Sequence, residues 1–253
     1  MITIDLSGKH AIVTGGSAGI GAAVAMTLAA AGATVTVLAR HRRHEGESAE
    51  LYADARVAFR TLDVADSGAV AEVLGSIAEA QGIDIAVLNA GKLSAGSLVD
   101  TSDEDWRDLM AVNLDGLFYC TREALRHMLA RGRGGKVVIV GSISGMEGNP
   151  GFAAYCTAKG AVVNLTRQAG IDYARQGINV NAVAPGFVDT RMTAPYDRKT
   201  RDYLSALTPN GRWATAQQIA DSVLFLSCSL SDHIHGQSIA VDGGWTAGKF
   251  LSP

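Results

Sequence analysis

The sequence predicts an α/β fold in which helices cover both faces of a doubly wound, seven-stranded parallel sheet. Two observations predict it. Short, almost continuously apolar runs alternate with longer helical patterns along the whole chain, as in parallel strands that are buried on both faces. The 253 residues also include 29 glycines, a share of about 11% against the usual ~7%. This excess indicates many tight turns between regular elements.

The apolar runs predict seven strands, at His10–Thr14, Thr34–Ala39, Val57–Thr61, Ile85–Asn89, Lys136–Gly141, Asn179–Ala184 and Ser238–Val241. The longer patterns between them predict helices at Gly19–Ala31, Ser67–Gln81, Asp103–Arg131, Ala154–Gln176 and Ala216–Ser227. Crossovers between the strands are expected to be right-handed. No Pro/Ser-rich linker, charge block or internal repeat divides the chain, so residues 1–253 are expected to form a single domain.

Composition excludes several functional classes. With 47% hydrophobic residues the chain is expected to fold, and a net charge of −3 disfavours nucleic-acid binding. The three cysteines are widely spaced, which predicts neither disulfides nor a zinc site but a reducing compartment. The uncharged stretch 11–39 is interrupted by glycines, so no membrane segment is expected. The sequence thus predicts a cytoplasmic protein without a membrane partner.

A glycine-rich turn follows the first strand over Thr14–Gly21, with the sequence TGGSAGIG. Gly15 permits the tight turn, while Gly19 and Gly21 allow a ligand to approach the backbone closely. The free N–H groups and positive end of the next helix suit a pyrophosphate. Because the turn opens a strand–helix–strand unit, it predicts dinucleotide binding by a Rossmann-type sheet.

The end of the second strand indicates which dinucleotide binds. An acidic residue about 20 residues after the turn commonly binds the 2′-OH of NAD, but no carboxylate appears here before Glu45. Arg40 is able to pair with a 2′-phosphate instead, assisted by the Ser17 hydroxyl. The sequence therefore favours NADP over NAD. In the alternative, Arg40 is a solvated residue of the basic run Arg40–His44.

A second group of residues indicates proton transfer. Tyr155 and Lys159 stand four residues apart, so both side chains lie on one face of a helix. A cation in a partly desolvated cleft is able to lower a tyrosine pKa from its usual value of ~10. Ser142 ends an apolar strand, at the sheet edge where ligands bind. These three residues predict acid–base chemistry at a substrate oxygen.

Together these motifs resemble the short-chain dehydrogenase/reductase family in its single-domain form, over essentially the whole chain. The residues that carry the resemblance are Thr14–Gly21, Asn89-Ala90-Gly91, Tyr155 with Lys159, Pro185-Gly186 with Thr190, and Val241-Asp242-Gly243-Gly244. The resemblance implies one domain that serves dinucleotide binding and catalysis, with hydride transfer between nicotinamide and a secondary alcohol or ketone.

The resemblance implies four catalytic positions. Tyr155 would be the general acid/base, and Ser142 would position the substrate oxygen. Lys159 would lower the tyrosine pKa and hold the nicotinamide ribose. Asn113, which its own sequence context marks as structural, would hold a water that links Lys159 to a proton relay.

Cofactor contacts follow from the same resemblance. Asp63 and Val64 would contact the adenine, Asn89 would steady the sheet, and Val188 and Thr190 would hold the carboxamide. The expected cofactor-binding residues are Gly15, Ser17, Gly19, Ile20, Gly21, Arg40, Asp63, Val64, Asn89, Ala90, Gly91, Tyr155, Lys159, Pro185, Gly186, Val188 and Thr190. A homotetramer packed through Asp103–Arg131 and Ala154–Gln176 is implied as well.

The substrate is less sharply predicted. The segment 187–213 lacks a strong period and is expected to be a substrate lid, with apolar contacts from Phe187, Met192, Tyr196 and Tyr203. Similarity to bacterial 3-oxoacyl-(acyl-carrier-protein) reductases leaves that activity as an alternative. Arg131 and Arg133 would then offer the acidic carrier a basic patch beside the cleft, although Gln176 stands where such reductases often carry a basic residue.

Other functions are disfavoured. A non-catalytic dinucleotide sensor need not keep Tyr155 and Lys159, both of which are present. An epimerase or dehydratase of this type would carry an added substrate segment. No metal is expected, because His233 and His235 lack a positioned third ligand.

Overall fold

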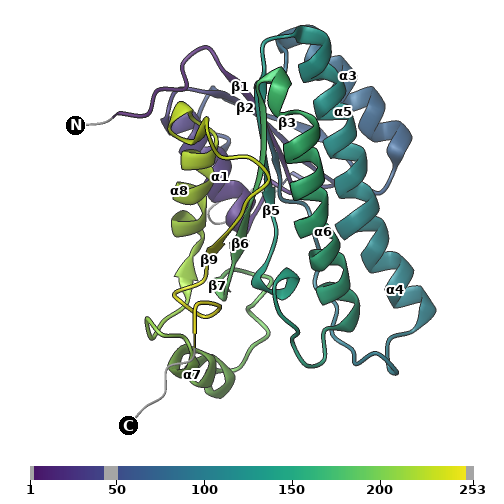
Figure 1. The fold of residues 1–253 in the computed structure, drawn as a ribbon, viewed down its shortest axis with the longest axis vertical. Coiled ribbons are helices and arrows are strands. Elements are labelled where there is room, and N and C mark those ends of the chain that lie inside the picture. Colours follow the sequence, from purple (N-terminus) through teal and green to yellow (C-terminus); the bar gives the residue numbers. More distant parts are fainter. Residues whose placement is uncertain (1–2, 43–50, 249–253) are drawn as a thin grey trace.

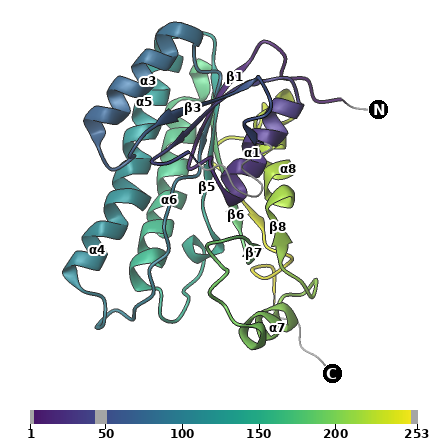
Figure 2. The same ribbon diagram turned by 180° about the vertical axis from the view of Figure 1, so that it is seen from behind.

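The computed structural model describes residues 3–42 and 51–248 and contains a seven-stranded parallel sheet (Figures 1 and 2). The strand order is β3-β2-β1-β4-β5-β6-β9. The chain builds the sheet from β1 toward β3 and then from β4 toward β9, so the order reverses between β1 and β4. The predicted doubly wound α/β fold is confirmed. The strands are β1 (His10–Thr14), β2 (Thr34–Ala39), β3 (Val57–Thr61), β4 (Ile85–Leu88), β5 (Gly135–Val140), β6 (Ile178–Pro185) and β9 (Ser238–Val241).

The apolar runs form strands because both faces of the sheet are covered. Every residue of β1, β4 and β6 is buried, whereas the edge strands β3 and β9 are partly exposed. On one face lie α1 (Gly19–Ala30) and α8 (Ala216–Leu226); on the other lie α3 (Ser67–Gln81), α5 (Gly116–Arg131) and α6 (Ala153–Asp172) (Figures 1 and 2). No helix in the described part of the chain is long and apolar enough to cross a membrane.

The helix predicted over Asp103–Arg131 is not uniform. It consists of α4 (Asp103–Met110), a π-helical turn at Ala111–Asp115, and α5. In the wide turn, the Gly116 N–H donates to the carbonyl of Ala111, five residues earlier. Asn113 lies inside this turn, and π-helical turns are frequent at functional sites. Similarly, α6 ends at Asp172 and a 3₁₀ turn completes the stretch to Gln176.

The segment 187–213 contains regular structure that its weak periodicity did not reveal. A short strand, β7 (Val188–Asp189), pairs with β8 (Ala214–Thr215), and α7 (Arg198–Leu207) lies between them. The Asp197 side chain caps α7 by accepting a hydrogen bond from the Thr200 N–H at 2.8 Å. None of its residues is buried, which explains why no core-facing pattern appears. In Figure 1, α7 lies at the lower end of the molecule, below β7.

Candidate active site

The glycine-rich turn between β1 and α1 is packed too closely to hold a side chain at Gly15 or Gly21. A Cβ atom on Gly15 would lie 2.9 Å from Nδ2 of Asn89, and one on Gly21 would lie 2.4 Å from the Gly15 carbonyl oxygen. The Asn89 side chain donates to the carbonyls of Thr14 and Gly15, each at 3.1 Å. The Thr14 hydroxyl accepts from the Asn89 N–H at 3.0 Å. These bonds join the ends of β1 and β4 and set the shape of the turn.

The first turn of α1 leaves backbone donors open for an anion. Its N-cap residue, Ala18, makes no side-chain cap, and no acidic residue lies in the first turn. The first N–H groups of a helix have no intrahelical partner, and together with the helix dipole they favour a phosphate. Thr190 lies against the same helix end, because a Cβ on Gly19 would be 3.5 Å from its side chain. The turn therefore fits the pyrophosphate of a dinucleotide.

Arg40 directly follows β2 and lies near the glycine-rich turn. The Gly15 N–H donates to the Leu38 carbonyl at 2.7 Å, which brings the end of β2 beside the turn. Arg40 is exposed and forms no ion pair with another described residue. Its guanidinium is therefore available to a phosphate bound at this edge. Arg43 and His44, which complete the basic run, lie outside the described residues.

The predicted acid–base residues line one cavity of about 530 Å³ at the carboxyl ends of β5 and β6. Ser142 follows β5, while Tyr155 and Lys159 lie in the first turns of α6. The Lys159 ammonium is 5.7 Å from the centre of the Tyr155 ring and donates to the Val140 carbonyl at 3.0 Å. The spacing of four residues thus brings both side chains to one wall of a site-sized pocket.

Asn113 acts on this site from behind its wall. Its side chain is 2% exposed, and its amide forms two hydrogen bonds with the backbone of Lys92, each 2.9 Å long. The amide oxygen accepts from the N–H and the amide nitrogen donates to the carbonyl. Because Lys92 follows Gly91 after β4, this pair fastens the π-helical turn to the loop that borders the cavity.

Burial dominates the electrostatics of the pair. It raises the pKa of Tyr155 above 10.0, and hydrogen bonding with Ser142 lowers the pKa by less. Burial also lowers the pKa of Lys159 to about 8, because a charged ammonium is poorly solvated there. In this structure the lysine therefore does not produce the low tyrosine pKa that the sequence predicted. At neutral pH Tyr155 is a phenol, the form that donates a proton.

Much of the predicted site is brought together by the fold. The predicted residues that line the cavity are Ile20, Asn89, Gly91, Ser142, Tyr155, Lys159, Pro185, Gly186, Val188 and Thr190. The remaining predicted residues lie outside this lining, and they are Gly15, Ser17, Gly19, Gly21, Arg40, Asp63, Val64, Ala90 and Asn113. Except for Asn113, which lies inside the π-helical turn, each lies in a loop that follows a strand of the sheet or in the first turn of α1. Val64, for example, packs against Gly116 at the start of α5.

Comparison with known proteins agrees with this geometry. The family model adh_short_C2, described as enoyl-(acyl carrier protein) reductase, matches residues 15–246. The chain belongs to the short-chain dehydrogenase/reductase family. It is an oxidoreductase of that family, as the resemblance implied.

Relatives of this short-chain dehydrogenase/reductase differ in substrate. Gluconate 5-dehydrogenase of Gluconobacter oxydans (strain 621H) is 38% identical over 254 residues, covering 96% of each chain. The 3-oxoacyl-[acyl-carrier-protein] reductase FabG of Escherichia coli (strain K12) is 36% identical, covering 95% of this chain and 98% of the relative. A solved structure of a putative 2-deoxy-D-gluconate 3-dehydrogenase from Agrobacterium tumefaciens with bound NADP has a TM-score of 0.91 and 36% identity, covering 98% and 100%.

Lys92 and Trp245 are among the residues lining the dehydrogenase/reductase cavity that sequence reasoning missed. Trp245 directly follows the Asp242–Gly244 pattern, and a tryptophan after two glycines was the available signal. The Asp242 carboxylate accepts from the Gly244 and Thr246 N–H groups at 2.9 and 2.8 Å. This compact turn holds Trp245 at the pocket wall.

The expected basic patch is in the wrong place. Arg131 ends α5 and donates to the Asp84 carboxylate at 2.9 Å, and Asp84 precedes β4. Arg133 precedes β5, at the same amino edge of the sheet. The cavity opens at the carboxyl edge, so within one chain neither arginine lies beside it. The positions of Arg131 and Arg133 in the sequence do not by themselves show at which edge of the sheet the two side chains lie.

Proposed function

We propose that this dehydrogenase/reductase interconverts a secondary alcohol and a ketone with NADP as cofactor, using Ser142, Tyr155 and Lys159. The observation that supports this most strongly is the convergence of these three side chains on one cavity, next to the uncapped end of α1. The bound nicotinamide supplies the hydride donor or acceptor. The test is a screen of ketones with NADPH and of alcohols with NADP, in which the change in nicotinamide absorbance measures turnover.

Proton movement is assigned to Tyr155. In the reductive direction its phenol donates a proton to the oxygen of the substrate carbonyl as that carbon becomes an alcohol carbon. The raised pKa keeps the phenol protonated at neutral pH. The Ser142 hydroxyl holds the same oxygen, because it already hydrogen-bonds with Tyr155 and accepts from the Ser144 N–H at 3.1 Å. In the oxidative direction the phenolate takes the proton back.

Lys159 and Asn113 support this step in different ways. The buried ammonium of Lys159 stabilises the Tyr155 phenolate once the proton has left, and it is proposed to hold the nicotinamide ribose. The Asn113 side chain positions the Lys92 backbone. We propose that the backbone of the π-helical turn holds the water of the relay implied by the family. The oxygen and the nitrogen of the Asn113 side-chain amide are both already hydrogen-bonded to the Lys92 backbone.

The pH profile tests the role of Lys159. Alcohol oxidation requires deprotonated Tyr155, so its initial rate is expected to rise with pH. Lys159→Ala removes the ammonium that is proposed to stabilise the phenolate, so it is expected to move that rise to higher pH. Below about pH 8 the wild-type lysine is charged, so the largest rate difference between the two proteins is expected there. Profiles that coincide at all pH values would contradict this role.

Arg40 is proposed to select NADP, with Ser17, Gly19 and the α1 end holding the phosphates. Because Arg40 is exposed beside the turn, Arg40→Ala is expected to weaken NADPH binding at least ~5-fold while leaving NADH nearly unchanged. Cofactor fluorescence titration measures both affinities. The control is Arg107→Ala, since Arg107 is an exposed residue paired with Asp103 on α4. Equal wild-type affinity for the two cofactors would contradict the assignment.

Reduction of a 3-oxoacyl group on a carrier protein is a second candidate, supported by 36% identity to FabG of Escherichia coli. Arg131 and Arg133 form no basic patch beside the cavity of their own chain. This favours a free small molecule over a carrier protein as the substrate. A sensor function is disfavoured because the acid–base residues are assembled. We also propose the cytoplasm as location, since all three cysteines are free.

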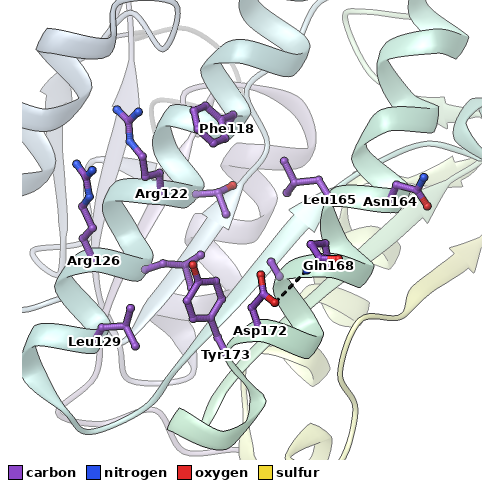
Figure 3. A pocket seen from close by; sticks show the side chains of 12 residues that line it. Phe118, Arg122, Arg126, Leu129, Asn164, Leu165, Gln168, Asp172 and Tyr173 are labelled. Atoms are coloured by element: carbon purple, nitrogen blue, oxygen red, sulfur yellow. Dashed lines mark hydrogen bonds between the residues drawn. The ribbon is translucent and has the colours of Figure 1, made fainter.

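A homotetramer is proposed from the outer face of α5 and α6. A groove of about 550 Å³ lies between these helices. Figure 3 shows Phe118, Leu129, Leu165 and Tyr173 among the side chains that border it. Phe118 and Leu129 are 45% and 39% exposed, and exposed apolar grooves mark contacts between proteins. A second copy presents the same surface to this groove. Light scattering is expected to give four times the 26.3 kDa of one chain; a monomer mass would reject the proposal.

A further inference from the structure

The cavity combines a smaller number of polar groups with a predominantly apolar lining. Beyond Ser142 and Tyr155, its walls consist largely of apolar and aromatic side chains, among them Leu93, Phe152, Phe187, Met192, Tyr203 and Trp245. Ligand pockets of this kind bind the body of the ligand by burial and orient it with few polar groups. The body of the substrate therefore meets a predominantly apolar surface.

Each cation of the lining is already engaged, Lys92 by an ion pair and Lys159 by a hydrogen bond. Among the described residues, the only charged side chains of the lining are Lys92 and Lys159. Lys159 donates to the Val140 carbonyl, and Lys92 is ion-paired with Asp108 of α4. A substrate carboxylate would have to compete for one of these cations. Most of a row of substrate hydroxyls would lose its water against apolar and aromatic surface, because the polar side chains of the lining, such as Ser144, Asn149 and Thr200, are in the minority.

A row of aromatic rings links the lid to the loop that carries Ser142. Tyr196 meets Trp213 edge-on at 5.9 Å, and Phe187 stacks on Trp213 at 5.4 Å. Phe187 also meets Trp245 edge-on at 5.0 Å. The indole N–H of Trp245 donates to the Glu147 carboxylate, and Glu147 lies between Ser142 and α6. The hydrogen bond therefore ties one wall of the cavity to the other.

Two apolar lining residues are left largely in water. Met192 is 47% exposed and Tyr203 is 63% exposed, both on the segment that borders the mouth. Exposed apolar side chains on a pocket wall are stabilised when an apolar ligand covers them. A polyhydroxylated ligand covers them without that gain. The exposure thus points in the same direction as the composition of the walls.

We infer that the substrate is an uncharged ketone or alcohol on a compact apolar ring system, packed against Phe187 and Trp245. We further infer that the Glu147–Trp245 hydrogen bond sets the width of the cavity and is a specificity determinant. The aromatic wall suits a ring better than a flexible chain, because a rigid ring packs against aromatic side chains with little loss of conformational freedom. This inference rests on the proposed function and narrows its substrate class.

The first experiment compares three ketones under one NADPH assay: a bicyclic aryl ketone such as tetralone, 5-dehydrogluconate, and an acetoacetyl thioester. The ring ketone is expected to have a kcat/KM at least about 100-fold above either competitor. Faster turnover of 5-dehydrogluconate or the thioester would overturn the substrate class while upholding the proposed function. If none of the three compounds and no ketone in the wider screen is turned over, both the substrate class and the proposed function are rejected.

The second experiment tests the determinant by substitution. Trp245→Phe keeps a ring but removes the indole N–H, and Glu147→Leu removes the acceptor. Each is expected to raise KM for the ring ketone about 10-fold with little change in kcat. Glu147→Gln keeps an acceptor oxygen and is expected to restore most of the affinity. Glu104→Gln on exposed α4 is the matched control.

A small ketone distinguishes this role from general damage. Butanone is too small to span the cavity between Trp245 and Ser142, so its KM is expected to be unchanged in these variants. Equal loss for butanone and the ring ketone would overturn the specificity role. Circular dichroism of each variant identifies one that fails to fold; if Glu147→Leu fails, Trp245→Phe carries the test, because it keeps an aromatic ring at the same position and removes only the indole N–H donor.

Discussion

Tyr155→Phe is expected to lower kcat for ketone reduction about 10³-fold, within the range typical of general acid–base groups. The substitution removes only the phenolic O–H, which is the proton donor in the proposed mechanism. The ring remains, so its packing against the buried cluster of Leu109, Ala154 and Ala158 is retained. Steady-state kinetics with NADPH and the best ketone from the screen measures the loss.

The same variant is expected to bind NADPH as tightly as the wild type. The phosphate and Arg40 contacts are proposed at the glycine-rich turn, away from the phenol. Tyr119→Phe, on α5 and outside the cavity lining, is the control that loses a hydroxyl elsewhere. If Tyr155→Phe retained more than about a tenth of wild-type kcat, another group would be the acid and the mechanism would need revision.

Gly21→Ala is expected to abolish tight cofactor binding and to lower the free energy of unfolding by about 1–3 kcal/mol. A Cβ at this position would lie 2.4 Å from the Gly15 carbonyl oxygen and 2.5 Å from the Asn89 side chain. Neither neighbour is able to move freely, because Asn89 holds the turn through Thr14 and Gly15. The turn must open, and the N–H groups that receive the phosphates move with it. Chemical denaturation and NADPH titration measure the two effects.

Gly75→Ala is the matched control for this prediction. Gly75 lies inside α3, and a Cβ there meets nothing within 4 Å. Alanine is the better helix former by up to ~1 kcal/mol, so this variant is expected to be as stable as the wild type or slightly more stable. A Gly21→Ala protein with wild-type stability and cofactor affinity would show that the turn tolerates a side chain.

Most of the fold could be predicted from the sequence, because parallel strands buried on both faces leave a strong local signal. The runs at β1 and β2 have the predicted bounds for that reason. The α7 helix left no such signal, since none of its residues is buried. The π-helical turn was missed for a related reason: one additional residue in a helical turn changes the hydrogen bonding but hardly alters a hydrophobic pattern.

By itself, the sequence indicated the family through its resemblance, and it predicted the sheet, the glycine-rich turn and the placement of Ser142, Tyr155 and Lys159 at one edge of the sheet, because spacing along a strand or helix decides which side chains share a face or an edge. Only the tertiary structure decided that burial raises the pKa of Tyr155, that Arg131 lies at the far edge of the sheet, and that Trp245 reaches Glu147 across the cavity. These properties depend on segments distant in the chain and on how much water their packing excludes, and neither is encoded in local spacing.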